Sequence, residues 1–230
     1  MNKSNRIFSN ELAYILALIT LAFGTALMEA ANFGVSMVVA PAYILHLKIS
    51  EFLPFFSFGM AEYSLQAVLL LFTVLIMRRF KLSYLFSFVT AVLYGFTLDG
   101  FIWLVGLVDA GTLWVRIPFY FVGMLFGSIG VSLFFHSYIS PEAYELFVKE
   151  ISERMKIDIH KFKTGYDCVS CLLSILLSFA FFGMWHFEGV KLGTVFCALV
   201  NGWIIGVCSK FFNKHWQFED KLPLRHLFER

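Results

Sequence analysis

Six long apolar stretches dominate the pattern of hydrophobic and polar positions along this chain. A membrane-spanning helix needs roughly 20 apolar residues, and each stretch is about that long. Charged residues inside the stretches are single interruptions, such as Glu29 and Glu62, and form no continuous polar face. The pattern predicts an all-α membrane protein with six transmembrane helices, at residues 11–33, 56–77, 83–107, 114–137, 166–186 and 191–211.

Two further segments have helical features without the character of a span. Residues 34–53 are apolar but contain Pro41, which would break a helix, so we predict a re-entrant or interfacial segment there. Residues 141–156 place apolar and charged positions at helical spacing, and Pro141 suits a first helical turn with Ser140 as N-cap. We predict an amphipathic helix here, on the cytoplasmic surface.

The two halves of the chain share a sequence pattern. Residues 87–98 align with residues 194–205 at an offset of 107, and the matched pairs are Ala91 with Ala198, Gly95 with Gly202, and Phe96 with Trp203. At an offset of 105, Glu62 aligns with Asp167, so that an acid stands near the predicted start of the second span in each half. The alternative is a chance alignment of two apolar helices.

Each half holds three spans, an odd number, so the second half must be inverted in the membrane relative to the first. Inverted repeats recur in secondary transporters, which bind substrate near the bilayer midplane between the repeats. We therefore predict a 3+3 inverted repeat within one transmembrane domain, residues 1–230. Its halves are at about 11–110 and 114–211, and a cytoplasmic tail follows at 212–230.

Composition and charge agree with this class and add an orientation. Hydrophobic residues make up 59% of the chain and charged residues 15%, against about 25% charged in soluble domains. Of the 18 Lys and Arg residues, 15 fall in the segments that share a side with the termini, and the other three are Lys48, Arg116 and Lys191. Positive charge marks cytoplasmic loops, so we predict N-in and C-in. Lipid contacts account for these charges, and we expect no nucleic-acid partner.

Four short motifs resemble those of a known group: Ile139-Ser-Pro-Glu-Ala-Tyr-Glu145, Lys163-Thr-Gly-Tyr-Asp167, Lys191-Leu-Gly-Thr194 and Asn201-Gly202. The chain resembles the YczE/YitT-like small bacterial membrane proteins over most of its second half. The match is weaker at Gly34-Val-Ser36, where no Ser-Pro follows. The resemblance implies a multi-pass protein of the bacterial cytoplasmic membrane, from a largely uncharacterised group.

Polar and ionisable side chains inside spans are costly and commonly mark function. The candidates for substrate binding or proton coupling are Glu29, Asn32, Glu62, Gln66, Asp99, Asp167 and Asn201. We expect Glu29, Glu62 and Asp167 to line a polar cavity, where they bind a cationic group or carry a proton. The alternative for Glu62 and Asp167 is that each caps a helix N-terminus.

A small transporter for an ion or small molecule is thus the first functional hypothesis. The second is a substrate-binding subunit of an uptake complex, because Ala26-x-x-x-Ala30 resembles the docking face of vitamin-uptake subunits. The third is a membrane thiol oxidoreductase that uses Cys168-x-x-Cys171. No catalytic, metal-ligand or phosphate-loop motif is present, so we expect no enzyme, metal or cofactor. The small-residue faces, including Gly123-x-x-x-Gly127, pack helices within the chain or in a homodimer.

Overall fold

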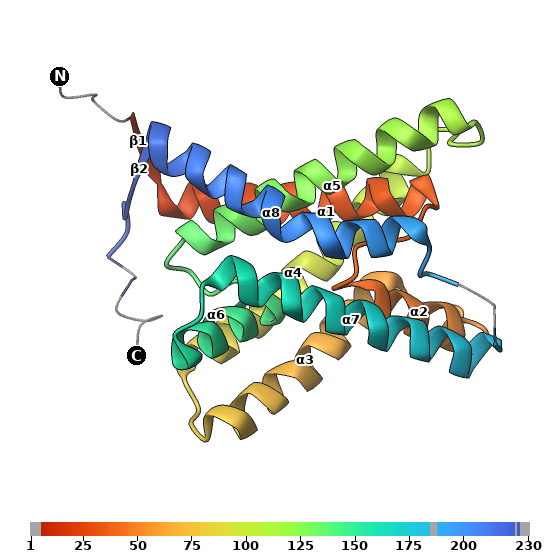
Figure 1. Ribbon diagram of the computed structural model, residues 1–230, viewed down its shortest axis with the longest axis horizontal. Helices are drawn as coiled ribbons and strands as arrows, with labels where there is room; N and C mark the ends of the chain where they lie inside the picture. Colours follow the sequence, from red (N-terminus) through yellow and green to blue (C-terminus); the bar gives the residue numbers. More distant parts are fainter. Residues whose placement is uncertain (1–5, 185–187, 224, 226–230) are drawn as a thin grey trace.

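The computed structural model describes residues 6–184, 188–223 and 225, and this part of the chain is almost entirely helical (Figure 1). Its elements are β1 (Arg6–Ser9), α1 (Asn10–Ala31), α2 (Ala40–Ser50), α3 (Phe58–Met77), α4 (Leu82–Val105), α5 (Leu113–His136), α6 (Ala143–Met155), α7 (Ile159–Phe182), α8 (Leu192–His215) and β2 (Trp216–Glu219). Within the described ranges, six helices are long and apolar enough to cross a membrane, namely α1, α3, α4, α5, α7 and α8. The predicted all-α membrane class with six spans is confirmed.

The largest difference from the predicted spans is the start of α7. The helix begins at Ile159 instead of residue 166, because the Asp158 side chain accepts hydrogen bonds from the backbone N–H groups of His160 and Lys161. The first two turns of α7 carry polar residues, so the apolar run alone placed the start too late. The helix ends at Phe182, and residues 185–186 of the predicted span lie outside the described residues.

The helices pack in two equivalent triplets. The helices α1 and α5 make the most extensive contact and run in opposite directions through the middle of the bundle (Figure 1). Each carries a partner from its own half, α4 on α1 and α8 on α5, and each half also pairs α3 with α4 or α7 with α8. Each short helix packs on both halves, since α2 contacts α3 and α7 and α6 contacts the same two helices. Exchanging the halves reproduces the main contacts, as an inverted repeat requires, but α6 also contacts α4 and α5.

The residues at which helices pack most closely in one half correspond to those in the other half at the two sequence offsets. In the first half Gly59 meets Gly95, and a Cβ placed on Gly95 would lie 2.8 Å from the carbonyl oxygen of Gly59. In the second half Thr164 meets Gly202, and a Cβ on Gly202 would lie 2.2 Å from the Thr164 hydroxyl oxygen. Gly59 corresponds to Thr164 at the offset of 105, which also aligns Glu62 with Asp167. Gly95 corresponds to Gly202 at the offset of 107.

The chain is broken at one place in each half, before α2 and before α6. Residues 32–39 lead from the end of α1 to the start of α2 inside the bundle, and residues 137–142 connect α5 to α6 in the same way. The Thr194 hydroxyl donates to the carbonyl of Val35 at 2.9 Å, and the Ser87 hydroxyl donates to the carbonyl of Pro141 at 2.6 Å. Thr194 and Ser87 align at the offset of 107, and each holds the broken segment of the other half.

Glycine is required at Gly34 in the first break. Its φ of 103° lies in the left-handed region, which residues with a side chain rarely adopt. A Cβ there would also lie 2.3 Å from the Thr194 hydroxyl oxygen. The predicted re-entrant segment at residues 34–53 therefore consists of a glycine-dependent break followed by α2, whose N-terminal half is buried.

The predicted amphipathic helix exists as α6, but its expected place on the cytoplasmic surface is wrong. Most of α6 is buried, and both Glu142 before it and Glu145 within it are at most 3% exposed. The charged residues at the start of the helix pack toward α3 and α7, and only the last turn, with Glu153 and Arg154, is exposed. The sequence pattern shows a polar helix face, but a helix at the surface and a helix that lines a polar interior have the same pattern.

Both ends of the described chain meet at one end of the bundle, which we call the strand end. There β1 and β2 pair in parallel, so the residues before α1 are joined to those after α8. The Glu11 carboxylate accepts hydrogen bonds from the Tyr138 hydroxyl at 2.8 Å and the backbone N–H of Leu222 at 2.8 Å. Burial and the neighbouring Glu11 raise the pKa of Tyr138 to about 12, so the phenol keeps the proton that it donates.

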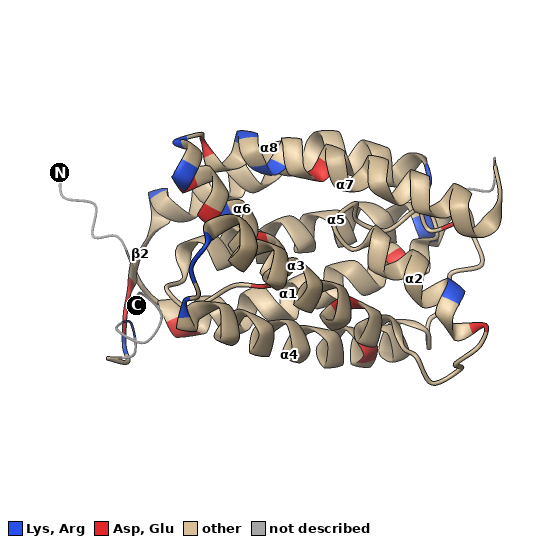
Figure 2. Ribbon diagram, turned by 90° about the horizontal axis from the view of Figure 1, so that it is seen from below, with Lys and Arg blue, Asp and Glu red and all other residues tan. Residues whose placement is uncertain are grey.

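The outer surface of the bundle suits a lipid environment. Large apolar side chains are exposed along the spans, among them Leu71, Leu75, Phe96, Leu199 and Trp203. Most Lys and Arg residues lie toward the strand end (Figure 2), which agrees with the uneven distribution of positive charge in the sequence. We call the opposite end, where α1 and α2 finish, the far end.

The crossing of α1 and α5 gives the first testable prediction. A Cβ on Gly24 would lie 2.6 Å from both the carbonyl oxygen of Gly123 and the amide nitrogen of Gly127, which are backbone atoms that cannot rotate away. We expect Gly24→Ala to destabilise the protein by about 1–3 kcal/mol, as overpacking does. The measurement is thermal denaturation in detergent.

The matched control is Gly100→Ala in α4, where an added Cβ meets nothing within 4 Å. Alanine is the better helix former, so this variant is expected to melt at or slightly above the parent temperature. Equal melting temperatures for the two variants would contradict a close backbone approach of α1 and α5.

Candidate functional site

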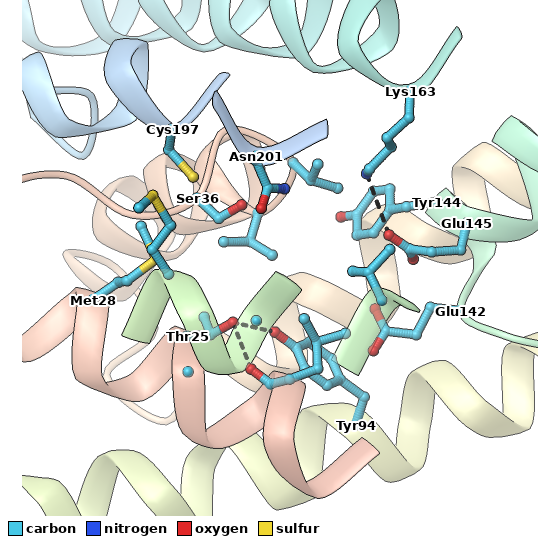
Figure 3. Close-up of a pocket in the computed structure, with 17 residues that line it drawn as sticks. Thr25, Met28, Ser36, Tyr94, Glu142, Tyr144, Glu145, Lys163, Cys197 and Asn201 are labelled. Atoms are coloured by element: carbon cyan, nitrogen blue, oxygen red, sulfur yellow. Dashed lines mark hydrogen bonds and ion pairs between the residues drawn. The ribbon is translucent and has the colours of Figure 1, made fainter. Parts of the chain in front are cut away.

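A small cavity lies in the middle of the bundle, where the two triplets meet (Figure 3). We call it the central cavity. Its volume is about 30 Å³, which is room for about two water molecules. Residues near the midpoints of four spans line it, including Thr25, Tyr94, Gly127 and Asn201, together with Ser36 from the first break. It therefore lies at mid-depth, between the two halves.

A network of buried acids adjoins this cavity on the side of α6. Gln66 on α3 donates to Glu142 at 3.2 Å and to Glu62 at 3.5 Å, while its amide oxygen accepts from the backbone N–H of Ala143 at 2.9 Å. The Tyr144 hydroxyl donates to Glu62 at 3.2 Å. The start of α6 is thereby tied to α3 through two carboxyl groups and one amide.

Lys163 supplies positive charge to the same region. Its ammonium lies 3.0 Å from Asp167, one turn along α7, and 3.3 Å from Glu145 on α6. All three side chains are at most 3% exposed. A buried ammonium held between two carboxylates is a desolvated ion pair, in which the loss of one partner leaves an uncompensated charge, and it links α6 to α7 as Gln66 links α6 to α3.

The acidic cluster, which we define as Glu62, Glu142, Glu145 and Asp167, thus has more acid than base. Four carboxyl groups face one ammonium from the described residues. One oxygen each of Glu62, Glu142 and Glu145 is buried without a hydrogen-bond partner in the described structure. Buried charge must be compensated, so the cluster requires protons or an external cation besides Lys163.

The structure brings together four of the predicted site residues. Glu62, Gln66 and Asp167 belong to the network, and Asn201 lines the central cavity and accepts from the Ser128 hydroxyl at 2.7 Å. The alternative that Glu62 and Asp167 cap helix N-termini does not hold. The N-caps of α3 and α7 are Ser57 and Asp158, and both acids lie inside their helices.

Glu29 and Asn32 lie elsewhere, at the far end. Glu29 accepts from the Tyr43 hydroxyl at 3.5 Å and lines a second cavity of about 20 Å³. Asn32 ends α1 in the left-handed conformation, and its carbonyl accepts from the Lys191 ammonium at 3.2 Å and from Arg116 at 3.1 Å. The expectation that Glu29 shares one cavity with Glu62 and Asp167 is therefore replaced by two separate cavities.

Asp99 has a structural role in this arrangement. Its carboxylate accepts from the Ser57 hydroxyl at 2.6 Å and from the backbone N–H of Gly59 at 2.8 Å. These groups form the N-terminus of α3, where the helix dipole favours a negative charge. Asp99 therefore fixes α3 to α4 and lies outside the acidic network.

Sequence reasoning missed Glu142, Tyr144, Glu145 and Lys163 as site residues. The three residues of α6 and its N-cap were read as part of a surface helix, and Lys163 was read as a positive loop charge. One signal was available, since Lys163 and Asp167 stand four residues apart, the spacing of a helical ion pair. It becomes visible only when α7 is started at Ile159.

The described residues offer no other chemistry of the kinds considered. No group of three or more His, Cys, Asp or Glu side chains within the described ranges is arranged to hold a metal ion. Cys168 is exposed on the outside of α7 while Cys171 is buried, and both thiols are free.

Comparison with known proteins places the chain in a family but supplies no activity. Residues 8–210 match a family of unknown function, DUF6198, and the chain belongs to this family. No curated protein and no solved structure matches the chain.

The ion pair gives the second prediction. Removing one partner of a buried pair costs about 3–5 kcal/mol, because an uncompensated charge remains. We expect Lys163→Met to lower the free energy of unfolding by about that amount, and Lys163→Met combined with Asp167→Asn to regain part of the loss. The measurement is chemical denaturation in detergent.

The control is Lys161→Met, because Lys161 lies two residues away on the same helix and is exposed. It should change stability by less than about 0.5 kcal/mol. If Lys163→Met were equally mild, the ammonium would not be compensating buried carboxylates.

Proposed function

We propose that this protein is a small secondary transporter, in which the central cavity and the acidic cluster form the substrate site. The observation that carries the proposal is the set of buried carboxyl oxygens without partners beside a cavity at the meeting of two inverted triplets. Intramembrane ionisable groups commonly mark ion pathways and proton relays. Transporters built from inverted repeats bind substrate at such a seam, where helices are broken.

The excess of acid selects the substrate class. A site with four carboxyl groups and one ammonium favours a small cation over an anion, since a cation supplies the missing charge. Protons can supply the same charge when the cation leaves. We therefore propose exchange of a small monovalent cation against protons. In the absence of the cation, the ammonium of Lys163 compensates part of the carboxylate charge and thereby keeps the protein folded.

The bacterial plasma membrane and the N-in, C-in orientation belong to this proposal. The distribution of Lys and Arg and the resemblance to YczE/YitT-like proteins support them. The thiol oxidoreductase hypothesis loses support because Cys168 and Cys171 face different surroundings, one outside the bundle and one within it.

The substrate-binding subunit hypothesis also loses support. Its docking face would be the Ala26-x-x-x-Ala30 stripe, but Ala26 is fully buried. The Gly123 face likewise packs on Gly24 within the chain. A homodimer through other faces stays a prediction.

The test is cation-driven proton movement in proteoliposomes that contain a trapped pH-sensitive dye. Sodium, potassium, lithium and ammonium chloride are added singly to the outside, and dye-reported proton movement is compared with that in protein-free liposomes. We expect at least one cation to move protons, and Glu142→Gln or Glu145→Gln to reduce the initial rate at least about tenfold, the effect of about 1.4 kcal/mol.

The matched control is Glu153→Gln, because Glu153 lies on the same short helix but is exposed. It should retain the parent rate. The proposal would be ruled out if none of the cations moved protons. It would also be ruled out if the rate were unchanged in both Glu142→Gln and Glu145→Gln. Melting temperatures of all variants distinguish lost transport from lost folding.

A further inference from the structure

Two cavities with carboxylates in their walls lie one after the other along α1, and they share one side chain. The central cavity and the Glu29 cavity are both lined by Met28, which is 2% exposed. The first break also borders both, since Gly34 and Val35 face the Glu29 cavity and Ser36 faces the central one. The flexible side chain of Met28 and a non-helical stretch of backbone thus border both cavities.

We propose that the Glu29 cavity is an entry site for small cations, and that cations pass from the far end to the acidic cluster by displacement of Met28. This inference rests on the proposed transport function and adds a second binding site and a route. The flexible, unbranched Met side chain adapts to irregular spaces, so it can move aside at low cost. The break beside it is held by hydrogen bonds from Gly193 and Thr194 to the carbonyls of Phe33 and Val35, so the side chain of Met28 is the part that moves.

Charge in the Glu29 cavity suits a cation. Glu29 and Glu188 both line it, and Tyr43, which donates to Glu29, forms its wall. Lys191 also lines the cavity, but its ammonium is held by the backbone carbonyl and side-chain oxygen of Asn32 at the end of α1. A cation that enters here therefore meets carboxylates whose nearest ammonium is already engaged.

The central cavity is ordered along the same line. Figure 3 shows Met28 and Cys197 on one side of the view and Glu142, Glu145 and Lys163 on the other. A cation that passes Met28 would first meet the hydroxyl and sulfur groups of Ser36 and Cys197, and only then the carboxylates.

Cys197 provides a natural reporter for this route, because its thiol lines the central cavity and is 1% exposed. The experiment uses a variant in which the other cysteines are replaced (Cys168→Ser, Cys171→Ala, Cys208→Ala) and a C-terminal tag shows sidedness in vesicles. Two methanethiosulfonate reagents of similar size are compared, one with an aminoethyl group and one with a sulfonatoethyl group. Each forms a disulfide with the Cys197 thiolate and releases methanesulfinate, which is followed by mass spectrometry.

From the side opposite the tag, we expect the cationic reagent to modify Cys197 at least about fivefold faster than the anionic one, as a unit charge near a carboxylate in a wet site implies. Glu29→Gln should shrink this preference, whereas Asp109→Asn, in an exposed loop at the same end, should leave it unchanged. Cysteine trapped inside the vesicles removes any reagent that leaks through the bilayer.

Met28→Ala should raise the rate for both reagents by at least about tenfold. The control is Met124→Ala, because Met124 lines the central cavity but not the Glu29 cavity. It should enlarge the interior without opening the route, so its rate should stay near that of the parent. Melting temperatures show whether each variant remains folded.

Three results would overturn the inference: faster labelling from the tagged side, equal rates for the two reagents, or equal acceleration by Met28→Ala and Met124→Ala. Labelling needs no transported substrate, so it is independent of the flux assay. Selective labelling without cation-driven proton movement would sustain the entry route and reject transport. Proton movement without selective labelling would do the reverse.

Discussion

The fold depends on satisfying backbone polar groups where the chain is broken inside an apolar environment. A bilayer offers no water to exposed N–H and C=O groups, so non-helical backbone survives there only when protein covers it. Here the covering groups come from the opposite triplet, since Thr194 binds the break before α2 and Ser87 binds the break before α6. Each triplet therefore covers part of the broken backbone of the other. The short helices agree with this arrangement, because α2 and α6 each pack on both α3 and α7.

The same requirement explains why a polar site lies at the seam. A break brings backbone N–H and C=O groups and their hydroxyl partners to mid-depth, where they can form hydrogen bonds with further polar side chains. The second half has more such side chains than the first. At the start of α6 stand Glu142 and Glu145, whereas α2 begins with Ala40, Pro41 and Ala42. Equivalent backbones therefore carry unequal chemistry, and the acidic cluster belongs to one side of an otherwise symmetric interior.

The sequence predicted the spans, the two short segments and the repeat because these rest on long apolar runs and on recurring small residues. The predictions were wrong where a polar residue could lie either in water or in a buried polar network. The charged face of α6 has the same periodicity whether it meets water or a buried network, and only packing against α3 and α7 decides. Lys163 was missed because it is the one buried residue in the polar, partly exposed first turns of α7. Glu62, Gln66 and Asn201 could be named as candidates because they interrupt apolar runs, and Asp167 because it stands at the start of one, signals that do not depend on tertiary contacts.

The pairing of β1 with β2 has a consequence for biosynthesis. The first element of the described chain and the last are neighbours in one two-stranded sheet, and Glu11 holds the backbone of Leu222 beside it. The ribosome makes β1 before the spans and β2 after them, so β1 has no partner until every span between them has been synthesised. The strand end can therefore close only after α8 has been made, and its closure ties the start of α1 in the first triplet to the end of α8 in the second.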